Sequence, residues 1–267
     1  FAQAPDGPIY LCAKQEIGQL VPDSVGRLHY LPLSPRLPDR VASNLSLFLT
    51  KATLHGVYFL SDHYLIRHQP GEEKFEVWAS PDTILDAFVS PDQQHLFLVC
   101  QQGLYRLSGN QGQWIGRVPF VTFGQEIRSS LPLEGFDPEN PSFLLCLNEG
   151  GLATYARGQL DFGPSPLQES YPDLIIWRGL RLQDGRICLA THTRGLLFID
   201  DSGSLLQELP LNQGLPPGPI YALFQDRERG LWASSETGIS RVSYPLTLRV
   251  FGAPHALGGL VTALTTY

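Results

Sequence analysis

The chain has 267 residues, of which 43% are hydrophobic and 17% charged, so it holds enough apolar material for a folded core and too little charge for disorder. With a net charge of −7 and no run of Lys or Arg, it does not fit a nucleic-acid-binding protein. It has no apolar stretch of roughly 18 residues, so we expect no membrane contact by this segment itself.

Six similar segments follow one another along the chain, each with a short apolar strand, a turn and another strand. In chain order they cover residues 10–20, 57–67, 95–107, 143–155, 187–199 and 220–242. Turn residues at 18, 64, 103, 151, 195 and 238 are separated by 46, 39, 48, 44 and 43 residues. A four-stranded propeller blade takes roughly 40–50 residues, and the alternating pattern of these segments does not fit helical repeats.

The two ends of the chain complement each other. Residues 260–267 match the first strand of a repeat, whereas the chain from Ile9 onward matches a second strand with no first strand before it. We therefore expect residues 261–266 to pair antiparallel with residues 9–13, which would leave no exposed strand edge. The sequence predicts an all-β protein, a single β-propeller over residues 1–267 with six four-stranded blades, closed by pairing of the C-terminal strand with the N-terminal blade. Seven blades are the alternative.

The sixth segment carries a resemblance to a known family. Residues 214–226 read Gly-Leu-Pro-Pro-Gly-Pro-Ile-Tyr-Ala-Leu-Phe-Gln-Asp, and residues 230–239 read Gly-Leu-Trp-Ala-Ser-Ser-Glu-Thr-Gly-Ile. This pattern resembles the two-component regulator propeller repeat, in which Gly-Leu-Pro and a short strand ending in Asp precede a Leu-Trp strand and a glycine turn. Residues 180–199 are also similar to that repeat, and the other copies match it less closely.

The resemblance implies a sensor. In that family the propeller usually forms the extracytoplasmic part of a signalling protein and is joined to a histidine kinase, a cyclase or a DNA-binding output module. It implies a periplasmic or extracellular location and a small molecule or oligosaccharide as ligand, and it allows a homodimer formed through a parent sensor. This sequence contains no output module, so we expect either the isolated sensor part or a stand-alone relative.

Polar residues in the turns after the second strands form the candidate binding face. In a propeller these turns and the connections between blades gather at one face around the axis, where loops of all blades converge. The alternative is that these residues are polar only because turns face water. The candidates for ligand binding are Glu16, Asp62, His63, Gln101, Glu149, His192, Arg194, Glu236 and His255.

The His and Cys residues are spread over different blades. His63, His192 and His255 come from separate positions around the ring, so we expect no metal site and no cofactor. Cys12, Cys100, Cys146 and Cys188 all fall in expected second strands of different blades, where a packing role explains them better than disulfide bonds. Trp232 holds the matching position in the sixth segment, and we expect it in the core between blades.

No catalytic signature is present, including nucleophile elbows, zinc-binding His-Glu-x-x-His, phosphate loops and paired Cys-x-x-Cys. The sequence therefore favours a non-catalytic propeller that senses or binds a ligand. One alternative is a scaffold that binds a partner protein. A less favoured alternative is a propeller lyase or hydrolase, which would cluster several titratable groups within hydrogen-bond reach at one face.

Overall fold

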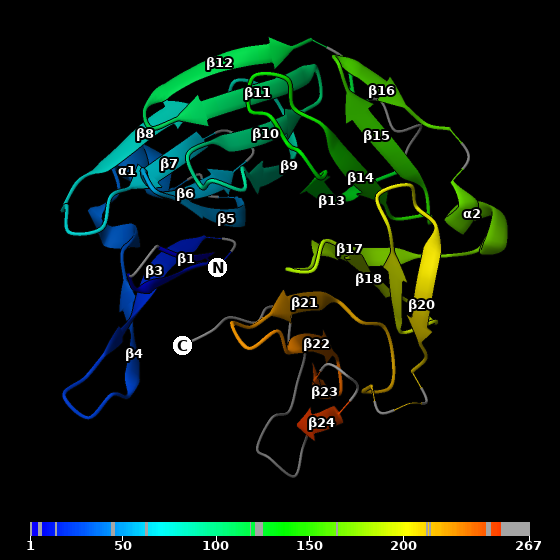
Figure 1. Ribbon diagram of the computed structural model, residues 1–267. Helices are drawn as coiled ribbons and strands as arrows, with labels where there is room; N and C mark the ends of the chain where they lie inside the picture. The colour runs from blue at the N-terminus through cyan, green and yellow to red at the C-terminus, as the bar shows by residue number, and fades with distance from the viewer. Residues whose placement is uncertain are drawn as a thin grey trace. The chain divides into compact units, whose positions relative to one another are not determined.

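A computed structural model describes residues 2–4, 7–13, 15–43, 46–61, 64–117, 119–120, 125–163, 165–211, 213, 215–243 and 247–251. The fold is an all-β propeller fold, with six four-stranded antiparallel sheets as its blades (Figure 1). The chain divides into two compact units, residues 1–121 and residues 122–267, and each holds three blades. The six-blade prediction is confirmed for the described residues.

Unit 1 contains the first three blades. The first consists of β1 (Ala2–Gln3), β2 (Ile9–Ala13), β3 (Glu16–Pro22) and β4 (Leu28–Pro32). The second consists of β5 (Leu47–Thr53), β6 (Gly56–Ser61), β7 (Tyr64–His68) and β8 (Phe75–Ala79), and the third of β9 (Ile84–Val89), β10 (Leu96–Cys100), β11 (Gly103–Ser108) and β12 (Gln111–Gly116). A 3-10 helix (Ser34–Arg36) and the short helix α1 (Asp39–Ala42) connect the first two blades.

Unit 2 contains the other three blades. The fourth consists of β13 (Ile127–Pro132), β14 (Phe143–Leu147), β15 (Leu152–Ala156) and β16 (Gln159–Asp161), and helix α2 (Pro166–Ser170) follows it. The fifth consists of β17 (Ile176–Arg181), β18 (Ile187–Thr191), β19 (Leu196–Ile199) and β20 (Leu205–Leu209). The sixth consists of β21 (Ala222–Gln225), β22 (Leu231–Ser235), β23 (Gly238–Ser243) and β24 (Thr247–Phe251).

The second strands form the middle of each unit's core. All five residues of β10, of β14 and of β18 are buried, which matches their uninterrupted apolar sequences. Each of the four Cys lies in a second strand, as predicted, and none of the four forms a disulfide bond. Burial raises the pKa of Cys100 to about 12 and also raises that of Cys188. These thiols are therefore packing residues.

Neighbouring blades in unit 2 approach closely at a glycine. The backbone N–H of Gly179 in β17 donates to the Ser129 hydroxyl in β13 over 2.9 Å. A Cβ atom at position 179 would lie 2.8 Å from the Cys146 sulfur, which is closer than two such atoms can pack. The absence of a side chain at this residue thus sets the spacing between the fourth and fifth blades.

The first blade differs from the expectation in two ways. The structure has a strand before Ile9, because Ala2–Gln3 form β1 and pair antiparallel with Tyr10 and Ile9. Gly18 is not a turn residue but lies inside β3, where the Tyr30 ring from β4 covers it; a Cβ at Gly18 would lie 2.2 Å from that ring. Gly18 was a misleading landmark because the glycine makes room for an aromatic ring and not for a turn. The predicted closing strand, residues 261–266, lies outside the described residues.

Trp232 is half-buried and does not sit fully in the core as expected. Its indole N–H donates to the Asp226 carboxylate over 2.8 Å, and Asp226 also accepts from the Gly230 N–H and from the Arg241 guanidinium, over 2.6 and 2.8 Å. The Asp and Trp of this repeat copy therefore hold the turn between β21 and β22 together.

Candidate functional site

The first strand of each blade is called its inner strand here. In unit 2 the inner strands β13 and β17 each begin with an irregular pairing that redirects one side chain. The pairing of β13 with β14 skips Arg128, and the pairing of β17 with β18 skips Trp177. Each is the extra residue of a β-bulge, a feature that bends a strand and redirects a side chain. Arg128 and Trp177 therefore leave the regular alternation of their strands at equivalent places.

Tyr221 takes the corresponding place in the sixth blade. It directly precedes β21, and the residue before it, Ile220, donates its N–H to the Thr191 carbonyl in the fifth blade over 3.1 Å. In the same way Ile176, which precedes Trp177, donates to the Asn148 carbonyl in the fourth blade over 2.9 Å. The backbone thus fixes these residues by the same interblade hydrogen bond.

Arg128, Trp177 and Tyr221 form a row across three consecutive blades. The guanidinium carbon of Arg128 lies 4.8 Å from the centre of the Trp177 ring. The rings of Trp177 and Tyr221 have centroids 5.0 Å apart and meet edge to face at 68°. Both kinds of contact are favourable, so the row is a connected surface and not three separate side chains.

Turn residues from the fifth and sixth blades complete this surface. The Trp177 indole N–H donates to Nδ1 of His192 over 3.2 Å, which leaves the proton of a neutral His192 ring on Nε2. The Tyr221 hydroxyl donates to Glu236 over 2.8 Å, and this hydrogen bond raises the pKa of Tyr221 above its ordinary value. Two turns that the sequence singles out are therefore joined to the inner strands by side-chain bonds.

The fourth blade adds an ion pair to the surface. Arg128 pairs with Glu126 over 2.9 Å, and Asn148 accepts the Glu126 N–H with its side-chain oxygen over 3.0 Å. The Nε atom of Arg128 is buried and makes no hydrogen bond within the described part of the chain. Together these residues make up what we call the Trp177 cluster: Glu126, Arg128, Trp177, His192, Tyr221 and Glu236.

The Trp177 cluster combines aromatic surface with hydrogen-bonding groups. Trp177, His192 and Tyr221 are half-buried, and the Glu126 and Glu236 carboxylates face water. The guanidinium and imidazole can donate hydrogen bonds while the two carboxylates accept them. This arrangement suits a polar ligand that also has a flat apolar face.

The structure brings only some of the predicted residues together. His192 and Glu236 belong to the Trp177 cluster, and Glu149 is exposed in the turn after β14, next to Asn148. Glu16 and Gln101 are exposed residues of unit 1, with Glu16 at the start of β3. Asp62, His63 and His255 lie outside the described residues.

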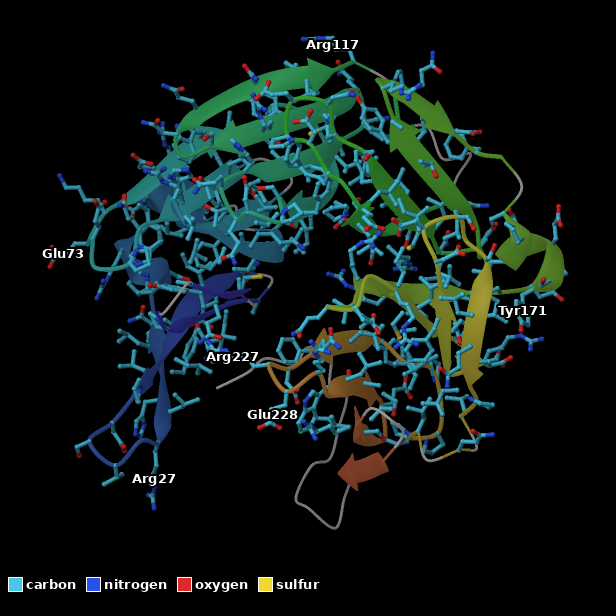
Figure 2. All side chains as sticks on the ribbon, viewed as in Figure 1. Arg27, Glu73, Arg117, Tyr171, Arg227 and Glu228 are labelled. Atoms are coloured by element: carbon cyan, nitrogen blue, oxygen red, sulfur yellow. The ribbon has the colours of Figure 1, made fainter. Side chains whose placement is uncertain are left out.

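Arg194 points away from the Trp177 cluster. Its guanidinium carbon lies 4.3 Å from the centre of the Tyr171 ring, and Tyr171 donates to Glu208 in the outer strand β20 over 3.2 Å. Figure 2 shows Tyr171 at the outer side of unit 2, beside α2. Although Arg194 shares a turn with His192, it packs against the outside of its blade.

The sequence analysis missed Glu126, Arg128, Trp177 and Tyr221 because it considered only the turns after second strands. A usable signal was present, since each bulged position, and the matching position of Tyr221, follows an aliphatic residue at or just before the start of an inner strand. The pairs are Leu47-Phe48, Ile84-Leu85, Ile127-Arg128, Ile176-Trp177 and Ile220-Tyr221.

The described residues lack two features, a metal-binding cluster and a membrane-spanning helix. They contain no group of three or more His, Cys, Asp or Glu side chains that could hold a metal ion. In the same ranges, no helix is long and apolar enough to cross a membrane.

No family model and no curated protein matches the chain. Solved structures do match it. The extracellular domain of the putative hybrid two component system BT4673 from B. thetaiotaomicron aligns with a TM-score of 0.66 at 15% identity, over 97% of this chain and 33% of that one. The corresponding domain of BT3049 from the same organism aligns with a TM-score of 0.57 at 15% identity, over 93% of this chain and 34% of that one.

An enzyme has a similar fold. Virginiamycin B lyase from Staphylococcus aureus aligns with a TM-score of 0.65 at 11% identity, over 94% of this chain and 83% of that one. At these identities the comparisons show a shared propeller fold. The chain spans about a third of the length of the two extracellular domains.

Proposed function

We propose that this chain is a non-catalytic sensor propeller that binds a small polyhydroxylated molecule, such as an oligosaccharide, at the Trp177 cluster. The observation that carries the proposal is the connected row of Arg128, Trp177 and Tyr221 across three blades. Aromatic rings present an apolar body that can pack against the C–H face of a sugar. Carboxylates and a guanidinium make charge-assisted hydrogen bonds with hydroxyl groups.

The place of the chain in a signalling protein is part of the proposal. Extracellular domains of two putative two-component systems are among its structural neighbours. This supports a role as the sensing part of a two-component-type protein in the periplasm or outside the cell. Dimerisation through a parent sensor is our proposal in addition. Glu149 stands as a further candidate ligand contact, because it is exposed in the turn that Asn148 ties to Glu126.

Calorimetric titration with a panel of neutral and acidic oligosaccharides tests the proposal. For a ligand that binds, Glu236→Gln should weaken affinity about tenfold, because a hydrogen bond to a charged group is lost. Glu169→Gln, on the exposed helix α2 of the same unit, is the matched control and should leave affinity unchanged. Equal effects of the two variants, or no binding to any member of the panel, would overturn the sugar-binding proposal.

A second candidate function is catalysis, because the Trp177 cluster gathers titratable groups and one structural neighbour is a lyase. Two observations favour binding over catalysis. The Tyr221 hydroxyl donates to Glu236, and Nδ1 of His192 accepts from the Trp177 N–H, so both atoms are already engaged within the cluster. Chromatographic detection of a product from a bound oligosaccharide would establish catalysis instead.

A further inference from the structure

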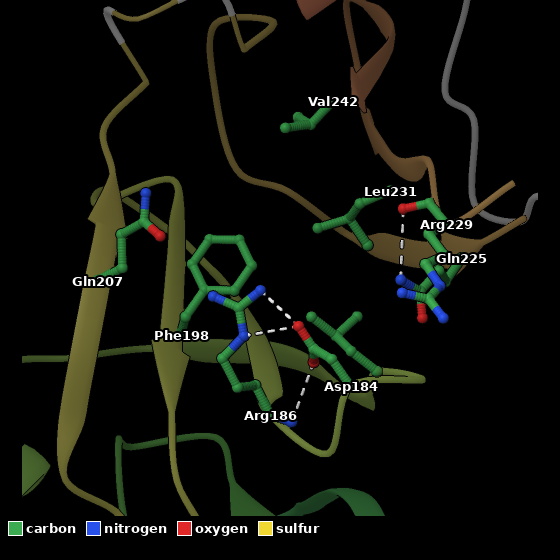
Figure 3. Close-up of a pocket in the computed structure, with 9 residues that line it drawn as sticks. Asp184, Arg186, Phe198, Gln207, Gln225, Arg229, Leu231 and Val242 are labelled. Atoms are coloured by element: carbon green, nitrogen blue, oxygen red, sulfur yellow. Dashed lines mark hydrogen bonds and ion pairs between the residues drawn. The ribbon is translucent and has the colours of Figure 1, made fainter. Parts of the chain in front are cut away.

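A pocket of 160 Å³ lies between the fifth and sixth blades of unit 2 (Figure 3). It is formed at the far ends of β17 and β21, whereas the Trp177 cluster lies where these inner strands begin. Its apolar wall consists of Leu182, Phe198, Leu231 and Val242, all of them buried. The volume is close to that of a cavity of about 150 Å³ that stays dry and takes up benzene.

Of the charged side chains that line the pocket, two pair with each other and one guanidinium has no partner among the described residues. Arg186 is paired with Asp184, through Nε over 2.8 Å and Nη2 over 2.6 Å, and it also lies over the Phe198 ring. Arg229 also lines the pocket, and its side chain makes no hydrogen bond or ion pair with any residue that the structure describes. The lining side chains thus carry a net charge of about +1 in a chain whose net charge is −7.

Arg229 occupies a turn position with a left-handed backbone, as Gln93 does in the third blade with a φ of +60°. Arg229 has a φ of +66° in the turn between β21 and β22, and its N–H donates to the Asp226 carbonyl. The equivalent turn of the fifth blade has the same bond from Gly185, whose φ is +88°. An Arg in the left-handed region is strained relative to Gly at the same place.

We infer that this pocket binds a small carboxylate with a compact aromatic or branched apolar body. The body would fill the space between Phe198, Leu231 and Val242, and the carboxylate would pair with the Arg229 guanidinium at the mouth. Gln207 lines the side of the pocket opposite Arg229 (Figure 3), so the carboxylate would pair with Arg229 alone. The site is separate from the Trp177 cluster and does not depend on the function proposed for it.

Titration of the whole chain with benzoate, followed by calorimetry, tests this inference. Benzoate should bind saturably in the millimolar range, as expected for so small a ligand. Benzamide keeps the ring but not the charge, and acetate keeps the charge but not the ring; each should bind at least about tenfold more weakly. Benzamide binding as tightly as benzoate, or no saturable benzoate binding, would overturn the inference.

Three variants locate the site. Arg229→Gln should weaken benzoate binding about tenfold, whereas Arg227→Gln, an exposed Arg of the same turn (Figure 2), should leave it unchanged. Arg229→Gly should raise the melting temperature, because it relieves the left-handed strain, and yet abolish the preference for benzoate over benzamide. If Arg227→Gln weakens binding as much as Arg229→Gln, the carboxylate is held only by general surface charge and the inference is wrong.

Discussion

The two units have the same arrangement of strands but carry different kinds of side chain at equivalent positions. The buried clusters between the blades of unit 1 include the rings of Tyr10, Tyr58 and Phe59, whereas Phe198 is the one ring among the buried members of the two clusters described between the blades of unit 2. The fully buried rings of Phe143 and Tyr155 stack on each other within the fourth blade. At the bulges the inner strands of unit 1 carry apolar Phe48 and Leu85, and those of unit 2 carry Arg128 and Trp177. The bulge is therefore a backbone feature that both units share, whereas the side chain that it carries differs between them.

The largest expected effect tests the aromatic core of unit 1. Phe59 is fully buried and meets Tyr10 with ring centroids 6.2 Å apart. Phe59→Ala should lower the free energy of unfolding by about 3–5 kcal/mol, because it leaves a cavity among rings that cannot collapse. Phe48→Ala, at a bulge residue that is 43% exposed, should cost less than about 1 kcal/mol. Urea unfolding measures both, and similar losses would show that the bulge is part of the core.

A middle-sized effect tests the turn that closes the sixth blade in unit 2. Burial alone would raise the pKa of Asp226, but the bonds from Arg241, Trp232 and the Gly230 N–H outweigh it and hold the pKa below its ordinary value. Asp226→Asn should therefore cost about 1–3 kcal/mol at pH 7. Because a lowered pKa stabilises the folded state only above the ordinary pKa, the difference should shrink as the pH falls from about 5 toward 2.

Urea midpoints of the wild type and Asp226→Asn across this pH range measure the effect. Other carboxylates with lowered pKa, such as Asp200, give the wild type its own acid sensitivity. The difference between the two proteins is thus the informative quantity. If the difference in urea midpoint between the two proteins stays constant down to pH 2, Asp226 is not ionised while it accepts these hydrogen bonds in the folded protein.

The smallest effect tests the Trp177 cluster. Trp177→Phe keeps a ring beside Arg128 and Tyr221 but removes the N–H that His192 accepts. We expect a loss of about 0.5–1.5 kcal/mol in unfolding free energy. The nitrogen chemical shifts of His192 should also lose their preference for the Nε2–H tautomer. Unchanged shifts would mean that the indole does not set the tautomer.

Much of the fold could be predicted from the sequence because the second strands are continuous apolar runs. Residues 96–100, 143–147 and 187–191 need burial on both faces, and their spacing indicates blades. The same argument placed all four Cys correctly in second strands. It failed at Gly18, since a glycine under an aromatic ring and a glycine in a turn look alike in sequence.

The candidate site could be predicted only in part. The polar pattern of the turns after second strands predicted His192 and Glu236 as binding candidates, because exposed turns are polar. It also predicted Arg194, which the tertiary structure places against Tyr171 on the outer side. Two residues of one turn can point in opposite directions, and composition carries no information about that choice.

Hydrophobic periodicity and turn spacing are local properties, so the sequence alone predicted an all-β repeat protein with six blades and left seven as the alternative. Only the tertiary structure decided that Arg128, Trp177 and Tyr221 form one surface. They are 44 or more residues apart in the sequence, and their contact depends on pairing registers that shift by one residue at the start of two strands. A register shift changes no residue and leaves no mark in composition, yet it decides which side chains leave the sheet and meet.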